Sequence, residues 1–187
     1  MRIVKLTQET EKNILENMLK RSPGQYGEYE SRVQEILARV KEQKDEAVFH
    51  YTKQFDRADI GPENVRVTGQ EIEEAYRQVD PELLQVMKKA LENIRSYHAL
   101  QKQNSWFEST EKGTMLGQKL TPLKTVGVYV PGGKAAYPSS VLMNIVPAKV
   151  AGVDRIIMCT PCNVRGQVNP IVLAAAKEAG ADGIYKV

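Results

Sequence analysis

Residues 126–152, VGVYVPGGKAAYPSSVLMNIVPAKVAG, decide the fold of this chain. The apolar, β-branched run Val126–Val130 is typical of a buried strand. Pro131-Gly132-Gly133 then predicts a tight turn without side-chain bulk. Apolar residues recur at helical spacing from Val141 to Val150, and Ser139-Ser140 before them are expected to cap that helix rather than act as nucleophiles. A strand, a glycine turn and a helix in this order offer backbone N–H groups to an anion.

Strands and helices alternate from Val126 to Val187. The expected elements are a strand at Val126–Val130, a helix at Ser139–Ala151, a strand at Arg155–Cys159, a helix at Val168–Ala179 and a strand at Gly183–Val187. This βαβαβ order predicts a parallel sheet with right-handed crossovers. We therefore expect residues 125–187 to form the first half of a Rossmann-like domain of the nucleotide-binding type.

Helices and one hairpin are expected before residue 125. Apolar spacing and capping residues predict a first helix capped by Thr7 and helices at about 29–43 and 45–55. A short strand at Val65–Val67 follows, then a helix after the capping box Thr68/Glu71 and a long helix from Pro81 to about Gln103. A hairpin of Trp106–Ser109 and Thr114–Leu120 is expected to turn at Lys112-Gly113. We expect Trp106-Phe107 to form the hairpin core. The fold class is α/β, with a helical arm over residues 1–24 and a helix-rich unit with a hairpin over residues 25–124.

The composition excludes several classes of function. Hydrophobic residues make up 42% of the chain and charged residues 26%, as in soluble globular proteins. The 26 basic and 23 acidic residues are interspersed, so there is no basic patch for nucleic acid. No run approaches the ~20 apolar residues of a membrane span. Two cysteines without a signal peptide indicate a reducing, cytoplasmic location.

Six ordered segments resemble the histidinol dehydrogenase family. They are NIRSYHALQ (93–101), GTMLGQKLTPL (113–123), GVYVPGG (127–133), AAYPSSVLMN (135–144), PAKVAGV (147–153) and AAAKEAGADGIYKV (174–187). The resemblance covers nearly the whole chain and is weakest before about Tyr26. It implies an aldehyde dehydrogenase-like superfamily fold. Family members are more than twice this long and continue with a glycine-rich segment, so the chain is expected to be an N-terminal fragment.

The resemblance implies a cofactor site at the end of the first parallel strand. The tyrosine of the family's G-x-Y-x-P-G-G pattern contacts NAD, and Tyr129 holds that position here. Pro131, Gly132 and Gly133 are expected to wall the same pocket. From the residues alone, the glycines could instead form a purely structural turn, and Tyr129 could pack beneath a helix. The G-x-G-x-x-G dinucleotide fingerprint is absent.

The cysteines and histidines could bind a metal or act in catalysis, but their sequence context indicates structural roles. Cys159 and Cys162 have C-x-x-C spacing, but no second Cys or His pair completes a four-ligand zinc site, so both are interpreted as packing residues. His98 lies on the apolar stripe of the long helix, and His50 lies beside aromatic residues. Both are interpreted as core-edge histidines. The sequence assigns no role to Asp56.

The resemblance implies a function for the whole parent protein. Such an enzyme oxidises L-histidinol through the aldehyde to L-histidine, reduces NAD twice, uses Zn²⁺ and a Glu-His pair, and is a homodimer. The zinc ligands and catalytic residues are expected after Val187, so none is assigned here and the fragment is expected to be inactive. Two alternatives stay open: another aldehyde dehydrogenase-like oxidoreductase such as a glutamyl phosphate reductase, and a non-catalytic nucleotide-binding module.

Overall fold

The computed structural model describes residues 5, 7, 9–12, 27–132 and 135–187. The chain divides into two compact units, Met1–Val48 and Phe49–Val187. Most of the predicted arm over residues 1–24 lies outside the described residues. Within it, Thr7 caps as expected, because the Thr10 N–H donates to Thr7 Oγ1 at 3.2 Å.

The first unit contains helix α2 (Gly27–Gln43) and the start of helix α3 (Asp45–Phe55). Helix α2 carries the predicted apolar stripe, and Tyr29, Val33 and Leu37 on it are exposed. Lys44 separates the two helices with a φ of 51°, a left-handed conformation that ends α2. Both helices therefore agree with the sequence prediction to within two residues.

Helices α4 (Gly69–Gln78) and α5 (Pro81–Ala99) begin at the predicted caps. Thr68 and Glu71 form a capping box, and the Asp80 side chain accepts the Glu82 N–H before Pro81 at the first helical position. Helix α5 ends four residues earlier than predicted, because residues from Leu100 onward leave the helix and are exposed.

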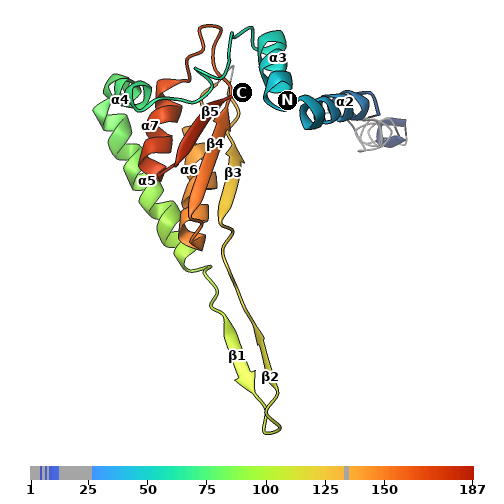
Figure 1. Cartoon of the computed structure of the whole chain (residues 1–187), viewed down its shortest axis with the longest axis vertical. Helices are drawn as coiled ribbons and strands as arrows, with labels where there is room; N and C mark the ends of the chain where they lie inside the picture. The colour runs from blue at the N-terminus through green and yellow to red at the C-terminus, as the bar shows by residue number, and fades with distance from the viewer. Residues whose placement is uncertain (1–4, 6, 8, 13–26, 133–134) are drawn as a thin grey trace. The chain divides into compact units, whose positions relative to one another are not determined.

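The last third of the chain forms the predicted βαβαβ unit (Figure 1). Its elements are β3 (Thr125–Tyr129), α6 (Pro138–Ala151), β4 (Arg155–Thr160), α7 (Pro170–Ala179) and β5 (Gly183–Lys186). The strands are parallel in the order β3-β4-β5. The predicted strand Val65–Val67 adds an antiparallel pairing to β5, with the Val67 N–H donating to the Ile184 carbonyl at 2.9 Å.

In the part of the chain that the structure describes, helices α6 and α7 cover one face of this sheet. Side chains alternate along β4, so that Ile156, Met158 and Thr160 are buried beneath the helices. Helices α4 and α5 add their buried residues to the same core. Because register pairs Tyr129 with Cys159 and Cys159 with Tyr185, these three side chains form a row across the other face, where they are exposed or half-buried. This face is called the open face below.

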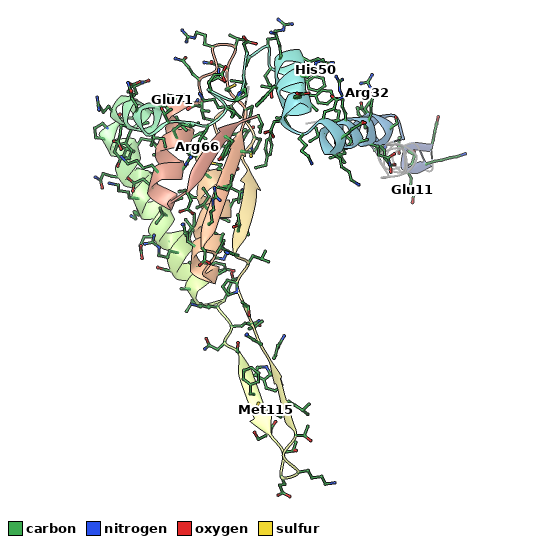
Figure 2. The ribbon with its side chains drawn as sticks, viewed as in Figure 1. Glu11, Arg32, His50, Arg66, Glu71 and Met115 are labelled. Atoms are coloured by element: carbon green, nitrogen blue, oxygen red, sulfur yellow. The ribbon has the colours of Figure 1, made fainter. Side chains whose placement is uncertain are left out.

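The hairpin consists of β1 (Trp106–Ser109) and β2 (Met115–Gln118). It turns at Gly113, whose φ of 78° requires a residue without a Cβ. Every residue from 99 to 125 is exposed, and Met115 lies away from the helices (Figure 2). The expectation that Trp106 and Phe107 form a buried core is wrong: their side chains are 55% and 59% exposed. A two-stranded ribbon has no second layer to bury them.

Two further corrections concern helix starts. Helix α6 begins at Pro138, with Tyr137 as its N-cap and no side-chain cap. Ser139 and Ser140 therefore lie inside the first turn and do not cap it. Helix α7 starts at Pro170 rather than at residue 168, because the Asn169 side chain caps it. None of the helices in the described part of the chain is both long and apolar enough to cross a membrane.

Candidate functional site

A cavity of about 410 Å³ lies at the carboxyl ends of β3 and β4. This is the edge of an open α/β sheet at which ligands bind. Its volume falls within the range of small-molecule sites. Four segments line it: one face of α4, the loop after β3, the loop after β4 and the first turn of α7.

Helix α4 supplies one wall through Glu71, Glu74, Ala75 and Gln78. Their spacing of three and four residues places them on a single helix face. Long-range contacts hold this helix against α7: the Tyr76 hydroxyl donates to Glu178 Oε1 at 2.5 Å, and Lys177 pairs with Glu73 at 2.7 Å. The wall is therefore fixed from the side opposite the cavity.

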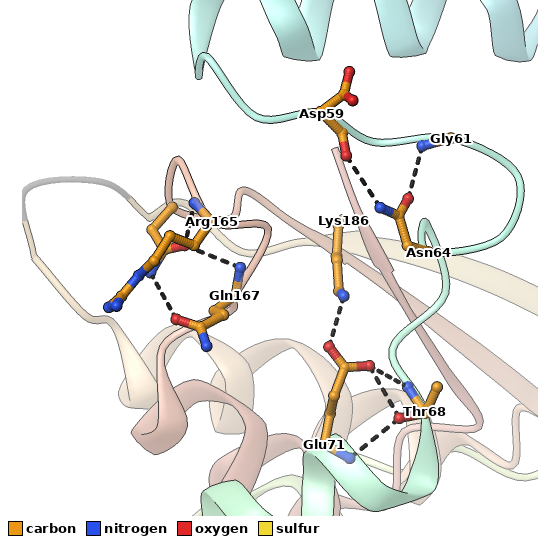
Figure 3. A network of polar contacts seen from close by, with 9 residues as sticks. Asp59, Gly61, Asn64, Thr68, Glu71, Arg165, Gln167 and Lys186 are labelled. Atoms are coloured by element: carbon orange, nitrogen blue, oxygen red, sulfur yellow. Dashed lines mark hydrogen bonds and ion pairs between the residues drawn. The ribbon is translucent and has the colours of Figure 1, made fainter.

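Glu71 also joins α4 to the end of the sheet (Figure 3). Its carboxylate accepts from Lys186 Nζ at 2.6 Å and from the Thr68 N–H at 2.8 Å. Burial alone would raise the pKa of Glu71, but the bonds from Lys186 and Thr68 outweigh it and hold the pKa below 4.5. Lys186 is only 6% exposed, so this pair stabilises a buried ammonium group.

The loop after β4 forms the opposite wall. Asn163 Oδ1 accepts the N–H groups of Arg165 and Gln167 at 2.9 and 3.0 Å, which fixes the turn. Gly166 makes this turn possible with a φ of 72°. The first turn of α7 contains no acidic residue. Arg165 and the N-terminus of α7 therefore give this wall a positive potential.

The predicted cofactor residues do not all meet at the cavity. Gly132 lines it, whereas Gly133 lies outside the described residues. A Cβ on Gly132 would lie 2.8 Å from Pro161 Cγ, so glycine lets the loops after β3 and β4 approach each other. Pro131 is exposed beside them. Tyr129 does not line the cavity: it lies on the open face and is 60% exposed, which contradicts the alternative of packing beneath a helix.

The two cysteines lie on different sides of the sheet edge. Cys159 belongs to the open face, and Cys162 lines the cavity. Burial raises the pKa of both thiols, and the charge of Asp56 raises that of Cys162 further. Thiols with raised pKa values are poor nucleophiles near neutral pH. This supports the interpretation of both residues as packing residues.

The histidines do not contribute to the cavity. His98 is half-buried, as expected, and its Nδ1 lies 2.6 Å from Gln101 Oε1. His50 is exposed, so its interpretation as a core-edge residue is wrong; its ring forms a T-shaped pair with Tyr51. Over the described ranges, no three His, Cys, Asp or Glu side chains gather in a way that could hold a metal ion.

Glu74, Arg165 and Lys186 were not among the site residues predicted from the sequence. The helical spacing of residues 71, 74, 75 and 78 could have placed Glu74 on a shared face with Glu71. Nothing local could have paired Glu71 with Lys186, because 115 residues separate them. This contact depends on how α4 packs on α7 in the folded chain, which no local sequence pattern reports.

The parallel three-stranded sheet, with a cavity at its carboxyl edge, defines an open α/β fold. The family model described as histidinol dehydrogenase matches residues 19–187. The chain belongs to the histidinol dehydrogenase family.

Individual relatives agree with this assignment. The chain is 53% identical over 156 residues to a histidinol dehydrogenase of Heliobacterium mobile, covering 83% of the chain and 37% of the relative. It is 52% identical over 160 residues to that of Bacillus subtilis, covering 86% and 37%. The crystal structure of histidinol dehydrogenase from Elizabethkingia anophelis matches with a TM-score of 0.78 and 37% identity, over 84% of the chain and 36% of that protein. The chain thus spans little more than a third of the length of these relatives.

Proposed function

We propose that this chain forms the N-terminal part of an NAD- and zinc-dependent dehydrogenase that oxidises L-histidinol through the aldehyde to L-histidine. The match of residues 19–187 to the histidinol dehydrogenase family carries this proposal. The reaction belongs to the whole protein, a cytoplasmic homodimer with an aldehyde dehydrogenase-like fold. Within the whole protein, the role of this chain is to bind NAD.

The cavity fits one half of a dinucleotide. Its positive wall, with Arg165 and the start of α7, suits a phosphate group, and Gly132 leaves the loop after β3 without a side chain. Tyr129 on the other side of the β3 end offers a ring and a hydroxyl group. NAD, when bound, supplies the hydride acceptor. The residues of this chain hold the nucleotide and orient it at the sheet edge.

Zinc does not fit the described residues. The C-x-x-C pair offers two thiols on different sides of the sheet edge, whereas a zinc site needs at least three protein ligands. We therefore assign neither zinc ligands nor proton-transferring groups to this chain. None of the described residues is assigned a direct part in the chemical step.

A chimera tests the proposal. Residues 1–187 would replace the matching N-terminal segment of the Bacillus subtilis relative. The chimera should form NADH in the presence of histidinol, measured by absorbance. The 187-residue chain alone should form none, because positioning cannot replace groups that carry protons.

Two outcomes would contradict the proposal. The first is a folded chimera that does not turn over histidinol. The second is turnover that co-purifies with the 187-residue chain during size exclusion. Titration of the chain with NAD distinguishes the remaining alternative, because a non-catalytic nucleotide-binding module would bind NAD while its chimera stayed inactive. The matched relatives named above are histidinol dehydrogenases, which disfavours a glutamyl phosphate reductase.

A further inference from the structure

We propose that Glu74 selects NAD against NADP by placing a carboxylate where the adenosine ribose binds. This inference rests on the proposed function, because it requires the cavity to hold the adenosine half of the cofactor. It goes further by assigning a role in specificity to a residue of α4, a helix outside the βαβαβ unit.

The charges that line the cavity are unequal on its two walls. On α4, the charge of Glu71 is balanced by Lys186 at 2.6 Å. Glu74 accepts a hydrogen bond from the neutral Gln70 amide at 2.7 Å, and no ion pair balances its charge in the described part of the chain. Arg165 lines the opposite wall. The cavity therefore has one uncompensated negative charge on α4 and a positive wall opposite.

This asymmetry orients a nucleotide. The phosphates belong beside Arg165 and the start of α7, where the potential is positive. The ribose then faces α4, where Glu74 can accept hydrogen bonds from its hydroxyl groups, as acidic residues do in NAD-specific folds. NADP carries a phosphate on the ribose 2′-oxygen. Because Glu74 would face that phosphate without a cation beside it, the two negative charges would repel each other.

Binding measurements test this assignment without any turnover. The dissociation constants of NAD and NADP are measured by calorimetry on the 187-residue chain and on its Glu74→Lys and Glu74→Ser variants. Glu63→Lys is the matched control, since Glu63 is exposed, lies outside the cavity lining and gives the same change of net charge. Circular dichroism confirms that each variant keeps its helices.

The unaltered chain should bind NAD about tenfold more tightly than NADP, a moderate ratio because solvent screens a charge at the rim. Glu74→Lys should bring the two dissociation constants to within about threefold of each other. The ratio for Glu74→Ser should lie between those of the unaltered chain and of Glu74→Lys. Glu63→Lys should leave the ratio unchanged. If NAD binds but the ratio of the two dissociation constants is the same in both Glu74 variants as in the unaltered chain, the role of Glu74 is wrong and the nucleotide site is retained. If neither nucleotide binds the unaltered chain, the nucleotide site fails and the inference fails with it.

Discussion

Glu71 combines two roles in a single carboxylate. It completes the capping box of α4 with Thr68, and it neutralises Lys186 at the end of β5. The first role follows from the sequence pattern, since a Thr three residues before a Glu is a local signal. The second depends on the packing of α4 and no pattern reports it. One residue thus connects helix formation to the geometry of the cavity wall.

Replacing Glu71 by Gln should destabilise the chain by about 2 kcal/mol at neutral pH, because it leaves the buried Lys186 ammonium unpaired. The folded-state pKa of Glu71 is lowered, so its contribution is complete above 4.5 and is lost as the pH falls through the lower folded value. The stability difference between the two proteins should therefore shrink in acid. Urea unfolding at neutral and acid pH measures it.

Glu73→Gln on the same helix serves as the control. Its partner Lys177 is 36% exposed, so this surface pair should contribute only about 0–1 kcal/mol. Equal losses in the two variants, or a Glu71 effect that does not change with pH, would contradict the role given to the Glu71–Lys186 pair.

Tyr129→Ala in the chimera should raise the KM for NAD about tenfold, or about 1–2 kcal/mol, and the KM for histidinol much less. The reason is that the Tyr129 ring at the end of β3 is 60% exposed and is available to a ligand. Tyr97→Ala, which removes a similarly exposed ring on α5, is the control. An unchanged KM for NAD in the Tyr129→Ala chimera would contradict the role of Tyr129 in binding NAD.

At the scale of the elements, the sequence predicts most of the structure. The βαβαβ order, the capping box of α4 and the Asp80-Pro81 start of α5 are all confirmed, because local patterns determine them. Exposure was predicted less well. The pairing of Phe107 with Gly117 explains how the hairpin forms although its side chains are exposed. The Phe107 ring lies over the glycine on the neighbouring strand, which stabilises the pair without a buried core.

The end of β4 provides an element-scale prediction about metal binding. Cys159 and Cys162 should not hold zinc stoichiometrically, because two thiols leave a tetrahedral ion half-coordinated. Elemental analysis of the purified chain after exposure to zinc measures the metal content, with the double variant Cys159→Ser/Cys162→Ser as the control. One tightly bound zinc per chain that the double variant lacks would overturn this prediction.

At the scale of the whole molecule, much apolar surface is uncovered. The open face of the sheet carries Tyr129 and Ile157, and β3 is an edge strand of the sheet that the described residues form. The hairpin and the segment that follows it add six large apolar residues that are all exposed, namely Trp106, Phe107, Met115, Leu116, Leu120 and Leu123. Clusters of exposed large apolar side chains are typical of surfaces that another protein segment covers.

The chain should therefore self-associate. Light scattering at micromolar concentration should report a dimer or a larger species, because uncovered parallel sheets and free strand edges promote association. Charged replacements on the hairpin, Phe107→Lys with Leu116→Lys, should reduce the apparent mass. A monodisperse monomer of 21.0 kDa with a sharp unfolding transition would show that the chain is a self-sufficient domain.

The cavity is formed by tertiary packing, which local sequence patterns do not report. Gly132 was identified because a glycine after a strand is a local signal. The contact of that glycine with Pro161, and the wall formed by Glu74, arise only when α4 and the loop after β4 are packed together. The predicted boundaries at residues 24 and 124 remain predictions. The buried core, however, joins α4 and α5 to the sheet, so these helices and the βαβαβ unit share their stability.

The base of the hairpin offers a place for engineering. Ser105 Oγ accepts the Leu120 N–H at 2.9 Å, so the two chain segments are already held together where the ribbon begins. A short glycine-containing turn could replace residues 106–119 at little cost in loop entropy. The same position should accept an inserted epitope or a fluorescent label, since no buried residue lies between Ala99 and Thr125. Shortened and labelled versions of the chain could then be made without altering its core.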